Sequence, residues 1–173
     1  MDDGAWPKPM KLSELARGPV YRRFALDAGV REKIAVELGV DGLARLEADV
    51  EISPWLDGAR LRGRIGALVQ QTCGVTLEPL ESEIDHDFEL KLLPVGSPNA
   101  PAAPEDAVLD PEAEDPPDLI EDNQVDLAAL VVELLAVEID PFPRKPGVVF
   151  DPGPDEQPPS PFAVLKDFKP RGG

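Results

Sequence analysis

The sequence predicts an α+β fold: an antiparallel sheet, open or closed into a small barrel, packed by one main helix and short flanking helices. Three observations lead to this prediction. Two segments alternate apolar and charged residues with a period of two, which is typical of strands with one wet face. A later segment carries leucines and valines at helical spacing. Strands and helices are segregated along the chain and do not alternate as βαβ units, which favours an antiparallel α+β domain.

The predicted strands follow one another closely. In 44–52 and in 80–92 the even positions are mostly apolar and the odd positions charged, so the even side chains, His86 among them, are expected to face inward. Between these segments, 61–73 predicts a third strand, in which Gly63 and Gly66 indicate a bend or bulge. Turn residues at Pro54, Asp57-Gly58 and 74–79 make the three strands a meander, and 20–26 is a further strand candidate.

Helix signals occur in three places. Asp27 is a candidate N-cap for a helix that carries Val30, Ile34 and Leu38 and ends at Gly39. Asp126 is a candidate N-cap for the main helix, 126–139, which Pro141 ends. Its apolar stripe, expected to cover the sheet, is Leu127, Leu130, Val131, Leu134 and Leu135. Ser160-Pro161 predicts the start of a short C-terminal helix with Phe162, Leu165 and Phe168 on one ridge.

These elements fit one domain, residues 15–169, preceded by an N-terminal extension, residues 1–14. The stretch 97–123 contains six prolines and nine acidic residues with almost no aliphatic pattern. Such a composition cannot bury enough apolar surface to offset the entropy of ordering the chain. We therefore expect residues 97–123 to be a disordered acidic insertion, acting as a solvated spacer or as a shield for a basic partner.

Composition limits the partners. Of 173 residues, 17 are Lys or Arg and 34 are Asp or Glu, which gives a formal net charge of −17. Such a charge argues against a mainly electrostatic grip on nucleic acid or on an anionic membrane, and we expect neither DNA nor a membrane as a partner. The single cysteine, Cys73, cannot form an intramolecular disulfide or, alone, a cysteine-based zinc site. The N-terminus lacks a signal-peptide pattern, and the longest apolar run, 127–132, is too short to span a bilayer. The sequence thus predicts a soluble cytoplasmic protein.

Signals for catalysis are weak. His86 among apolar neighbours is expected to be a hydrogen-bonded core residue, and Cys73 a buried, inert thiol. The acidic row of 81–89 could bind a divalent cation, although a solvated strand face is the simpler interpretation. The sequence contains no phosphate-binding glycine loop, nucleophile elbow or metalloprotease helix. We therefore expect no catalytic residue, no metal and no cofactor.

Arginines supply the candidate binding surface. Arg60, Arg62 and Arg64 alternate on one face of a predicted strand, and Arg22 and Arg23 lie in another strand candidate. If these strands are neighbours, the arginines could form a local basic patch for RNA phosphates. The alternative, which we favour, is cross-strand pairing with the acids of the preceding strand, Glu47, Asp49 and Glu51.

The order of motifs resembles the YceD family, also called domain of unknown function 177. The resemblance covers about residues 15–169 and looks most like the alphaproteobacterial branch. It rests on GALVQQTCGVTLEPL (66–80), the acidic alternating strand, the acidic loop, VDLAALVVELLA (125–136), DPFPRKPG (140–147) and SPFAVLKDFK (160–169). The family comprises bacterial and plastid large ribosomal RNA subunit accumulation proteins. The resemblance implies a role in synthesis, processing or stability of that RNA, without an established catalytic activity.

Many members of the family carry a Cys-x-x-Cys pair at 73–76 and further cysteines near 144–147, which suggests a metal site in those relatives. Here only Cys73 matches, so we do not expect that site in this chain. The same region supplies Arg144 and Lys145, and the C-terminal motif supplies Phe162 and Leu165. We add these four residues to the candidates for binding RNA or a partner.

The leading hypothesis is a non-enzymatic ribosome biogenesis factor that binds a ribosomal protein or an assembling particle. Two alternatives remain open. One is a metal-dependent RNA-processing enzyme that uses the acidic strand 81–89. The other is an adaptor whose segment 162–168 docks in a groove of a partner.

Overall fold

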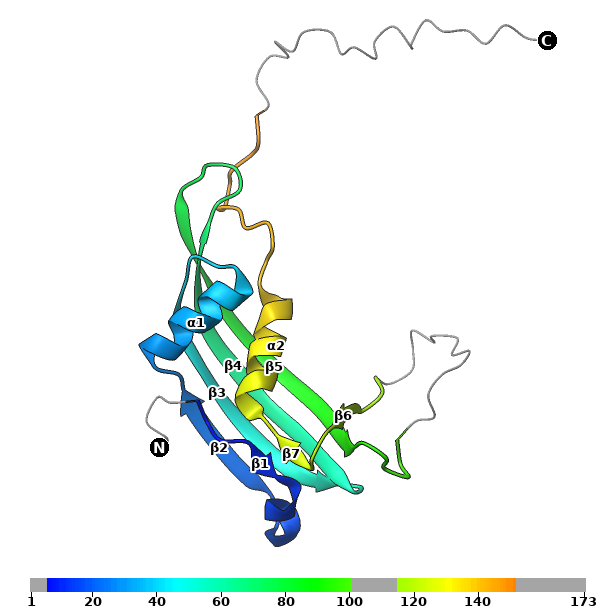
Figure 1. The fold of residues 1–173 in the computed structure, drawn as a ribbon. Coiled ribbons are helices and arrows are strands. Elements are labelled where there is room, and N and C mark those ends of the chain that lie inside the picture. Colours follow the sequence, from blue (N-terminus) through cyan, green and yellow to red (C-terminus); the bar gives the residue numbers. More distant parts are fainter. Residues whose placement is uncertain (1–5, 101–114, 152–173) are drawn as a thin grey trace, which may run out of the picture.

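The structure is a computed structural model that describes residues 6–100 and 115–151. Its centre is a five-stranded sheet of order β2-β3-β4-β5-β6, in which neighbours are antiparallel except β5 and β6, which are parallel (Figure 1). The strands are β2 (Val20–Ala25), β3 (Gly42–Trp55), β4 (Gly58–Thr72), β5 (Pro79–Pro94) and β6 (Asp118–Ile120). The fold is therefore α+β with a mostly antiparallel sheet, and the predicted meander is β3-β4-β5.

Two helices lie across one face of this sheet, α1 (Ala28–Leu38) and α2 (Leu127–Glu138) (Figure 1). They have 11 and 12 residues, so neither is the main helix by length. Within the described residues the edge strands β2 and β6 do not pair with each other, so the sheet is open there and the barrel alternative is wrong. Buried side chains of both helices and of the sheet form one hydrophobic cluster.

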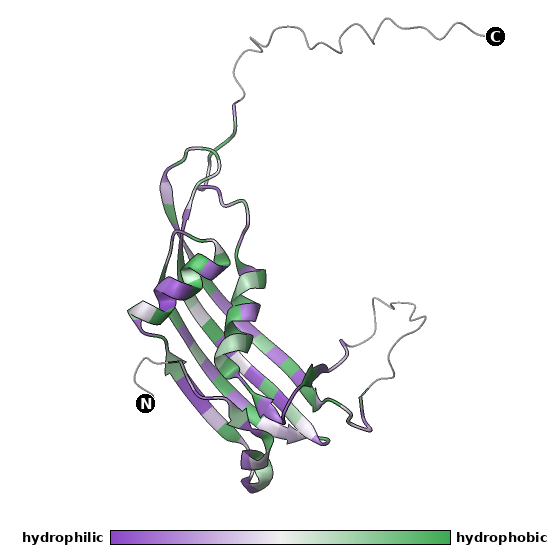
Figure 2. Cartoon of the chain, viewed as in Figure 1, coloured by the Kyte–Doolittle hydropathy of each residue, from purple (hydrophilic) through white to green (hydrophobic). Residues whose placement is uncertain are grey.

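Alternation along the strands decides which side chains enter this cluster. Figure 2 shows hydrophilic and hydrophobic residues alternating along the long strands. In β3 the expected alternation holds from Leu46 to Ile52, where the even positions are buried. It fails at Ala44, which is exposed, because a bulge between Leu43 and Arg45 shifts the register and buries Leu43 instead.

The glycines of β4 were predicted to mark a bend or a bulge, and the bulge is wrong. The pairing of β4 with β5 runs without a register shift, and the shift in its pairing with β3 lies between Leu43 and Arg45, away from Gly63 and Gly66. Gly63 instead makes room for a ring. A Cβ at Gly63 would lie 2.8 Å from Phe88 Cζ and 2.4 Å from the carbonyl oxygen of Asp49. Gly63 therefore lets the Phe88 ring close over the sheet backbone.

Both predicted N-caps are confirmed. Asp27 accepts a hydrogen bond from the Val30 N–H at 2.8 Å, and Asp126 accepts from the N–H groups of Ala128 and Ala129, each at 3.1 Å. The buried stripe of α2 is rotated relative to the expected one, because Ala128 and Val132 are buried whereas Leu130 and Leu134 are only half-buried. The buried residues of α2 are Leu127, Ala128, Val131, Val132 and Leu135.

The chain joins the domain earlier than expected. Within the predicted N-terminal extension, β1 (Met10–Lys11) pairs with β7 (Gln124–Val125), and the 3₁₀ helix η1 (Leu12–Arg17) begins directly afterwards. Met10 is buried in the core, 3% exposed, beside Val125 in the same cluster. These contacts place residues from Met10 onward inside the fold.

The segment 97–123, predicted to be a disordered insertion, forms contacts with the rest of the fold at both of its described ends. Its described C-terminal part forms β6, which runs parallel to β5. At its N-terminal end, Ser97 and Asn99 donate hydrogen bonds of 2.8 and 2.9 Å to Asp57 in the β3–β4 turn, and these bonds lower the pKa of Asp57. Residues 101–114 and the predicted C-terminal helix lie outside the described residues. No helix in the described part of the chain is long and apolar enough to cross a membrane.

Candidate functional site

The candidate site is the sheet face that points away from α1 and α2, here called the outer face. Strand register puts side chains that pair directly across the strands on the same face, so the outer face is a set of charged rows. Its carboxylates outnumber its cations. The cations are Arg23, Arg45, Arg60, Arg62, Arg64 and Lys91, and the carboxylates are Glu47, Asp49, Glu51, Glu81, Glu83, Asp85, Asp87 and Glu89.

The arginine row of β4 pairs with β5. Arg62 Nε lies 2.8 Å from Glu89 Oε2, and Arg60 Nε lies 3.5 Å from the other oxygen of the same carboxylate. Arg64 binds the Asp85 carboxylate through two nitrogens. These arginines hold the pKa values of Glu89 and Asp85 below their usual range, although burial acts in the opposite direction. The prediction of cross-strand pairing is thus right in kind, but these arginines pair with the following strand and not with the preceding one.

The acidic row of β3 is neutralised less completely. Asp49 pairs with Arg23 of β2. Arg45 lies 3.2 Å from Glu47 and 2.8 Å from Glu83. Glu51 forms no ion pair with a described Lys or Arg. It lies directly across the strands from Tyr21 of β2, and its carboxylate raises the pKa of the phenol.

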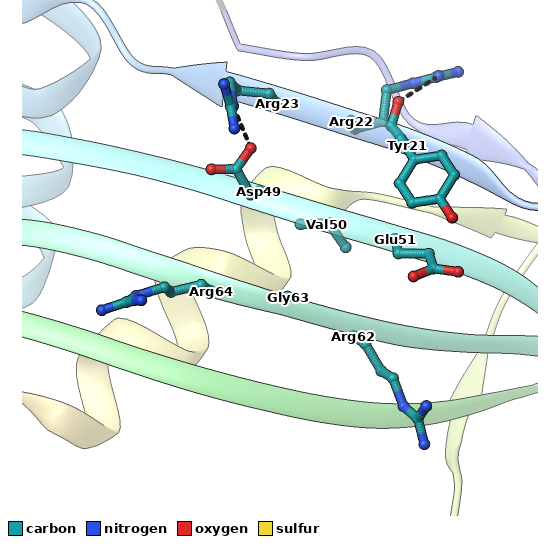
Figure 3. A pocket seen from close by; sticks show the side chains of 9 residues that line it. All are labelled: Tyr21, Arg22, Arg23, Asp49, Val50, Glu51, Arg62, Gly63 and Arg64. Atoms are coloured by element: carbon teal, nitrogen blue, oxygen red, sulfur yellow. Dashed lines mark hydrogen bonds and ion pairs between the residues drawn. The ribbon is translucent and has the colours of Figure 1, made fainter.

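A hollow of about 560 Å³ opens on the outer face between these rows. Figure 3 shows the Tyr21 hydroxyl pointing toward the Glu51 carboxylate on one side of the hollow. On the other side, the guanidinium groups of Arg62 and Arg64 point away from its centre. The floor is backbone at Val50 and Gly63, because the Val50 side chain points to the core.

Arg22 does not belong to the outer face. Side chains alternate along β2, so Arg22 and Arg23 project from opposite faces of the strand. Arg22 turns to η1, where its Nη2 lies 3.3 Å from Glu14 Oε2. The structure therefore separates two arginines that the sequence analysis grouped.

Lys145 and Arg144 lie at the far end of the molecule, where the chain after α2 meets the β4–β5 connection. The N–H of Lys145 donates to Cys73 Sγ at 3.4 Å, and its Nζ lies 2.8 Å from Glu78, whose pKa it lowers. Arg144 is exposed. Phe162 and Leu165 lie outside the described residues, so the structure does not place them.

Cys73 is fully buried, at 0% exposed, as expected. Hydrogen bonds from the hydroxyl and N–H of Thr76 and from the N–H of Lys145 lower its pKa to about 6, against the effect of burial. A zinc site does not fit here, because the sulfur has backbone N–H neighbours where a metal would need further ligands. Within residues 6–100 and 115–151, no group of three His, Cys, Asp or Glu residues is arranged to hold a metal ion.

His86 is half-buried on the helix-covered face of β5. Its Nδ1 lies 3.2 Å from Glu138 Oε1 at the end of α2. This contact gives the imidazole a polar partner between strand and helix. The side chain is 33% exposed, however, and His86 is not among the buried core residues, so the expected position in the core is wrong.

Tyr21 is the site residue that sequence reasoning missed. Tyr21 lies two residues before Arg23 in β2, so both side chains project from the same face of the strand. This spacing was the sequence signal that could have identified it. Its importance depends on the register of β2 against β3, which pairs it with Glu51, and the sequence does not specify that register.

Comparisons with known proteins place this fold in a family. A search of curated proteins finds no match, and neither does a search of solved structures. A family model described as large ribosomal RNA subunit accumulation protein YceD matches residues 61–169, which include most of β4 and all of β5 and α2. This match spans more than half of the chain, so the protein belongs to the YceD family.

Proposed function

We propose that this protein is a non-enzymatic factor in bacterial ribosome biogenesis that acts in the cytoplasm by binding a basic ribosomal protein or an assembling large-subunit particle. The family name gives the process, accumulation of large ribosomal RNA. The observation that favours a protein partner is the charge pattern of the outer face. Its arginines already have carboxylate partners, and carboxylates are in excess.

The ion pairs bear on the choice between RNA and protein. An RNA phosphate would have to displace Glu89 from Arg62 and Asp85 from Arg64, and would then remain beside the displaced carboxylates. Exposed ion pairs are individually weak, so the displacement alone costs little. The repulsion from neighbouring acids and from a net charge of −17 is the larger obstacle. A basic protein, in contrast, is attracted both by the neighbouring acids and by the net negative charge.

The alternative of a metal-dependent RNA-processing enzyme on 81–89 has less support. Asp85 and Glu89 point toward arginines of β4 and are engaged by them. Within the described residues, no three carboxylates are arranged to hold a metal ion, and this is the main argument against the alternative.

The test is a pull-down with the full chain from a lysate, at rising salt, with and without nuclease. We expect basic large-subunit proteins to be captured, to remain after nuclease treatment, and to be released as salt screens the charges. Loss of all capture after nuclease treatment would show that RNA holds the complex and would contradict the proposal.

A charge-reversal variant makes this test sharper. Arg62→Glu with Arg64→Glu adds negative charge to the outer face, so capture of a basic protein should be retained or strengthened, whereas direct RNA binding should be lost. Lys33→Glu is the control, because Lys33 is exposed on α1, on the helix-covered side of the sheet. Reduced protein capture in the double variant, with circular dichroism unchanged, would count against the proposal.

A further inference from the structure

We propose that the hollow beside Tyr21 and Glu51 is a pocket for one arginine side chain of a basic partner protein, with the guanidinium on the Glu51 carboxylate and against the Tyr21 ring. This inference rests on the proposed function, since it specifies how a basic protein would be held.

The polar groups of the hollow favour a cation once their ion pairs are counted, because each of the four arginines that line it already has a carboxylate partner. Glu51 is the carboxylate lining it that no described Lys or Arg neutralises, whereas Asp49 is already paired with Arg23. The guanidinium groups of Arg62 and Arg64 are drawn toward Glu89 and Asp85 on β5 and do not converge on the hollow (Figure 3). An anion in the hollow would therefore face carboxylates without a converging set of donors. A cation would find an acceptor.

Tyr21 adds a surface for a flat cation. Tyr21 is an aromatic residue on a strand, yet it is 69% exposed, so its ring does not serve to pack the hydrophobic core. Its hydroxyl is oriented toward Glu51, which places the ring edge beside the carboxylate. A guanidinium can stack on an aromatic face and donate two parallel hydrogen bonds to a carboxylate, whereas a lysine ammonium is a compact point charge. The pair therefore favours arginine over lysine.

The floor of the hollow suits a long side chain. Because Val50 and Gly63 leave only backbone on this face, the aliphatic part of an arginine can lie flat across β3 and β4. Arg62 and Arg64 line the hollow beside this path, and their guanidinium groups bind carboxylates of β5. The net charge of −17 brings basic segments to the protein, and the hollow gives one of their side chains a defined place.

The probe for the test is a fluorescein-labelled peptide of arginines separated by glycines, titrated with the full chain and followed by fluorescence anisotropy. Glu51→Gln keeps the shape of the side chain and removes its charge. We expect it to weaken binding by about fivefold or more, as for loss of a charge-assisted hydrogen bond. Tyr21→Leu should weaken binding by about two- to fivefold, whereas Tyr21→Phe keeps the ring and should stay within about twofold.

Asp87→Asn is the matched control. It removes the same charge from the same face, but Asp87 lies on β5 outside the hollow. Its side chain is 83% exposed, and its contact with Arg64 is loose, at 4.0 Å. We expect a change of less than about twofold, as for a loosely held surface charge. An equal loss in Asp87→Asn and Glu51→Gln would mean diffuse attraction to an acidic face and would overturn the pocket, while leaving the proposed function standing.

Two further probes separate the remaining outcomes. The same peptide with lysines should bind more weakly and respond less to Tyr21→Leu; equal affinity and equal response would contradict an arginine pocket. A single-stranded RNA oligonucleotide should not compete with the peptide. Competition by RNA would place phosphates at the outer face and overturn the pocket, whereas failure of the proposed function itself would appear as loss of nuclease-resistant capture in the pull-down.

Discussion

Glu138 Oε1, at the C-terminal end of α2, lies 3.2 Å from His86 Nδ1 in the middle of β5. This contact connects the last turn of the helix to the sheet beneath it. Both side chains are about one-third exposed, at 33% and 37%, so water competes for the pair. We expect it to orient the end of α2 and to add little stability.

A double-mutant cycle measures this contribution. His86→Gln and Glu138→Gln, alone and together, should give a coupling energy below about 1 kcal/mol, as for a partly exposed polar pair. Urea unfolding of the four proteins gives the value. A coupling of several kcal/mol would mean that the pair is far better shielded than its exposed fraction implies.

Packing of α2 on the sheet can be tested within one helix. Leu135 is fully buried, at 0% exposed, whereas Val137, two residues later, is 82% exposed. Leu135→Ala should lower the free energy of unfolding by about 2–5 kcal/mol through lost burial and the cavity left behind. Val137→Ala should change it by less than about 0.5 kcal/mol. Similar effects of both substitutions in chemical denaturation would show that α2 does not pack as described.

The two glycines of β4 give a matched pair. Gly63→Ala places a methyl group 2.4 Å from a backbone oxygen and 2.8 Å from the Phe88 ring, so the strand or the ring must move. We expect a loss of about 1–3 kcal/mol in the free energy of unfolding, typical of overpacking. At Gly66 the nearest atom to an added Cβ is Glu47 Oε1, the movable end of a side chain, at 3.2 Å. Gly66→Ala should be close to neutral, and equal losses in the two variants would show that the Phe88 contact is not the cause.

Stability should depend on pH through Cys73. Hydrogen bonds lower the pKa of this thiol to about 6 in the folded protein, whereas its ordinary value is 9.0. Between these values the unfolded chain binds more protons at this site than the folded chain, so the stabilisation is complete above the unfolded pKa and is lost as pH falls through about 6.

Comparing the free energy of unfolding of the wild type and Cys73→Ala across this pH range isolates the effect of the thiol. The wild type should gain stability relative to the variant as pH rises from 6 to 9. A constant difference between them would mean that the thiol keeps its ordinary pKa in the folded chain.

Local sequence signals predict the strands and helix starts well because period-two alternation and N-caps depend on neighbouring residues. Asp27 and Asp126 therefore form the N-cap hydrogen bonds that the sequence predicts. Ala44 was placed on the wrong face because a bulge inserts one residue into the strand without a distinctive residue at that point. The role of Gly63 was not predicted because the need for a glycine there comes from the ring of Phe88, which lies on another strand.

The site was less predictable than the fold because it depends on register and on competition between charges. The sequence predicts that Arg62 and Arg64 lie on one face. Both neighbouring strands, β3 and β5, offer acidic partners to them, so the sequence does not decide which strand they pair with. Only the structure shows that the arginines lean toward β5 and leave Glu51 to Tyr21. The pairing of β1 with β7 likewise cannot be predicted from local sequence, because it joins residues more than 100 positions apart.

Leu77, in the β4–β5 connection, adopts a left-handed backbone conformation with φ of 58°. Its N–H donates to the carbonyl of Cys73 at 2.9 Å, which holds the turn, while its side chain is 77% exposed. A leucine pays a steric cost in this conformation and gains little burial in return. Leu77→Asn should therefore raise the free energy of unfolding by about 1 kcal/mol, because asparagine tolerates this conformation better.

Leu77→Ala is the control for that variant. Alanine removes the exposed side chain but keeps the Cβ that clashes in the left-handed region, so its stability should match that of the wild type. Thermal or urea unfolding of the three proteins distinguishes backbone strain from packing. If both substitutions lower stability alike, the Leu77 side chain contributes contacts that outweigh the cost of its backbone conformation.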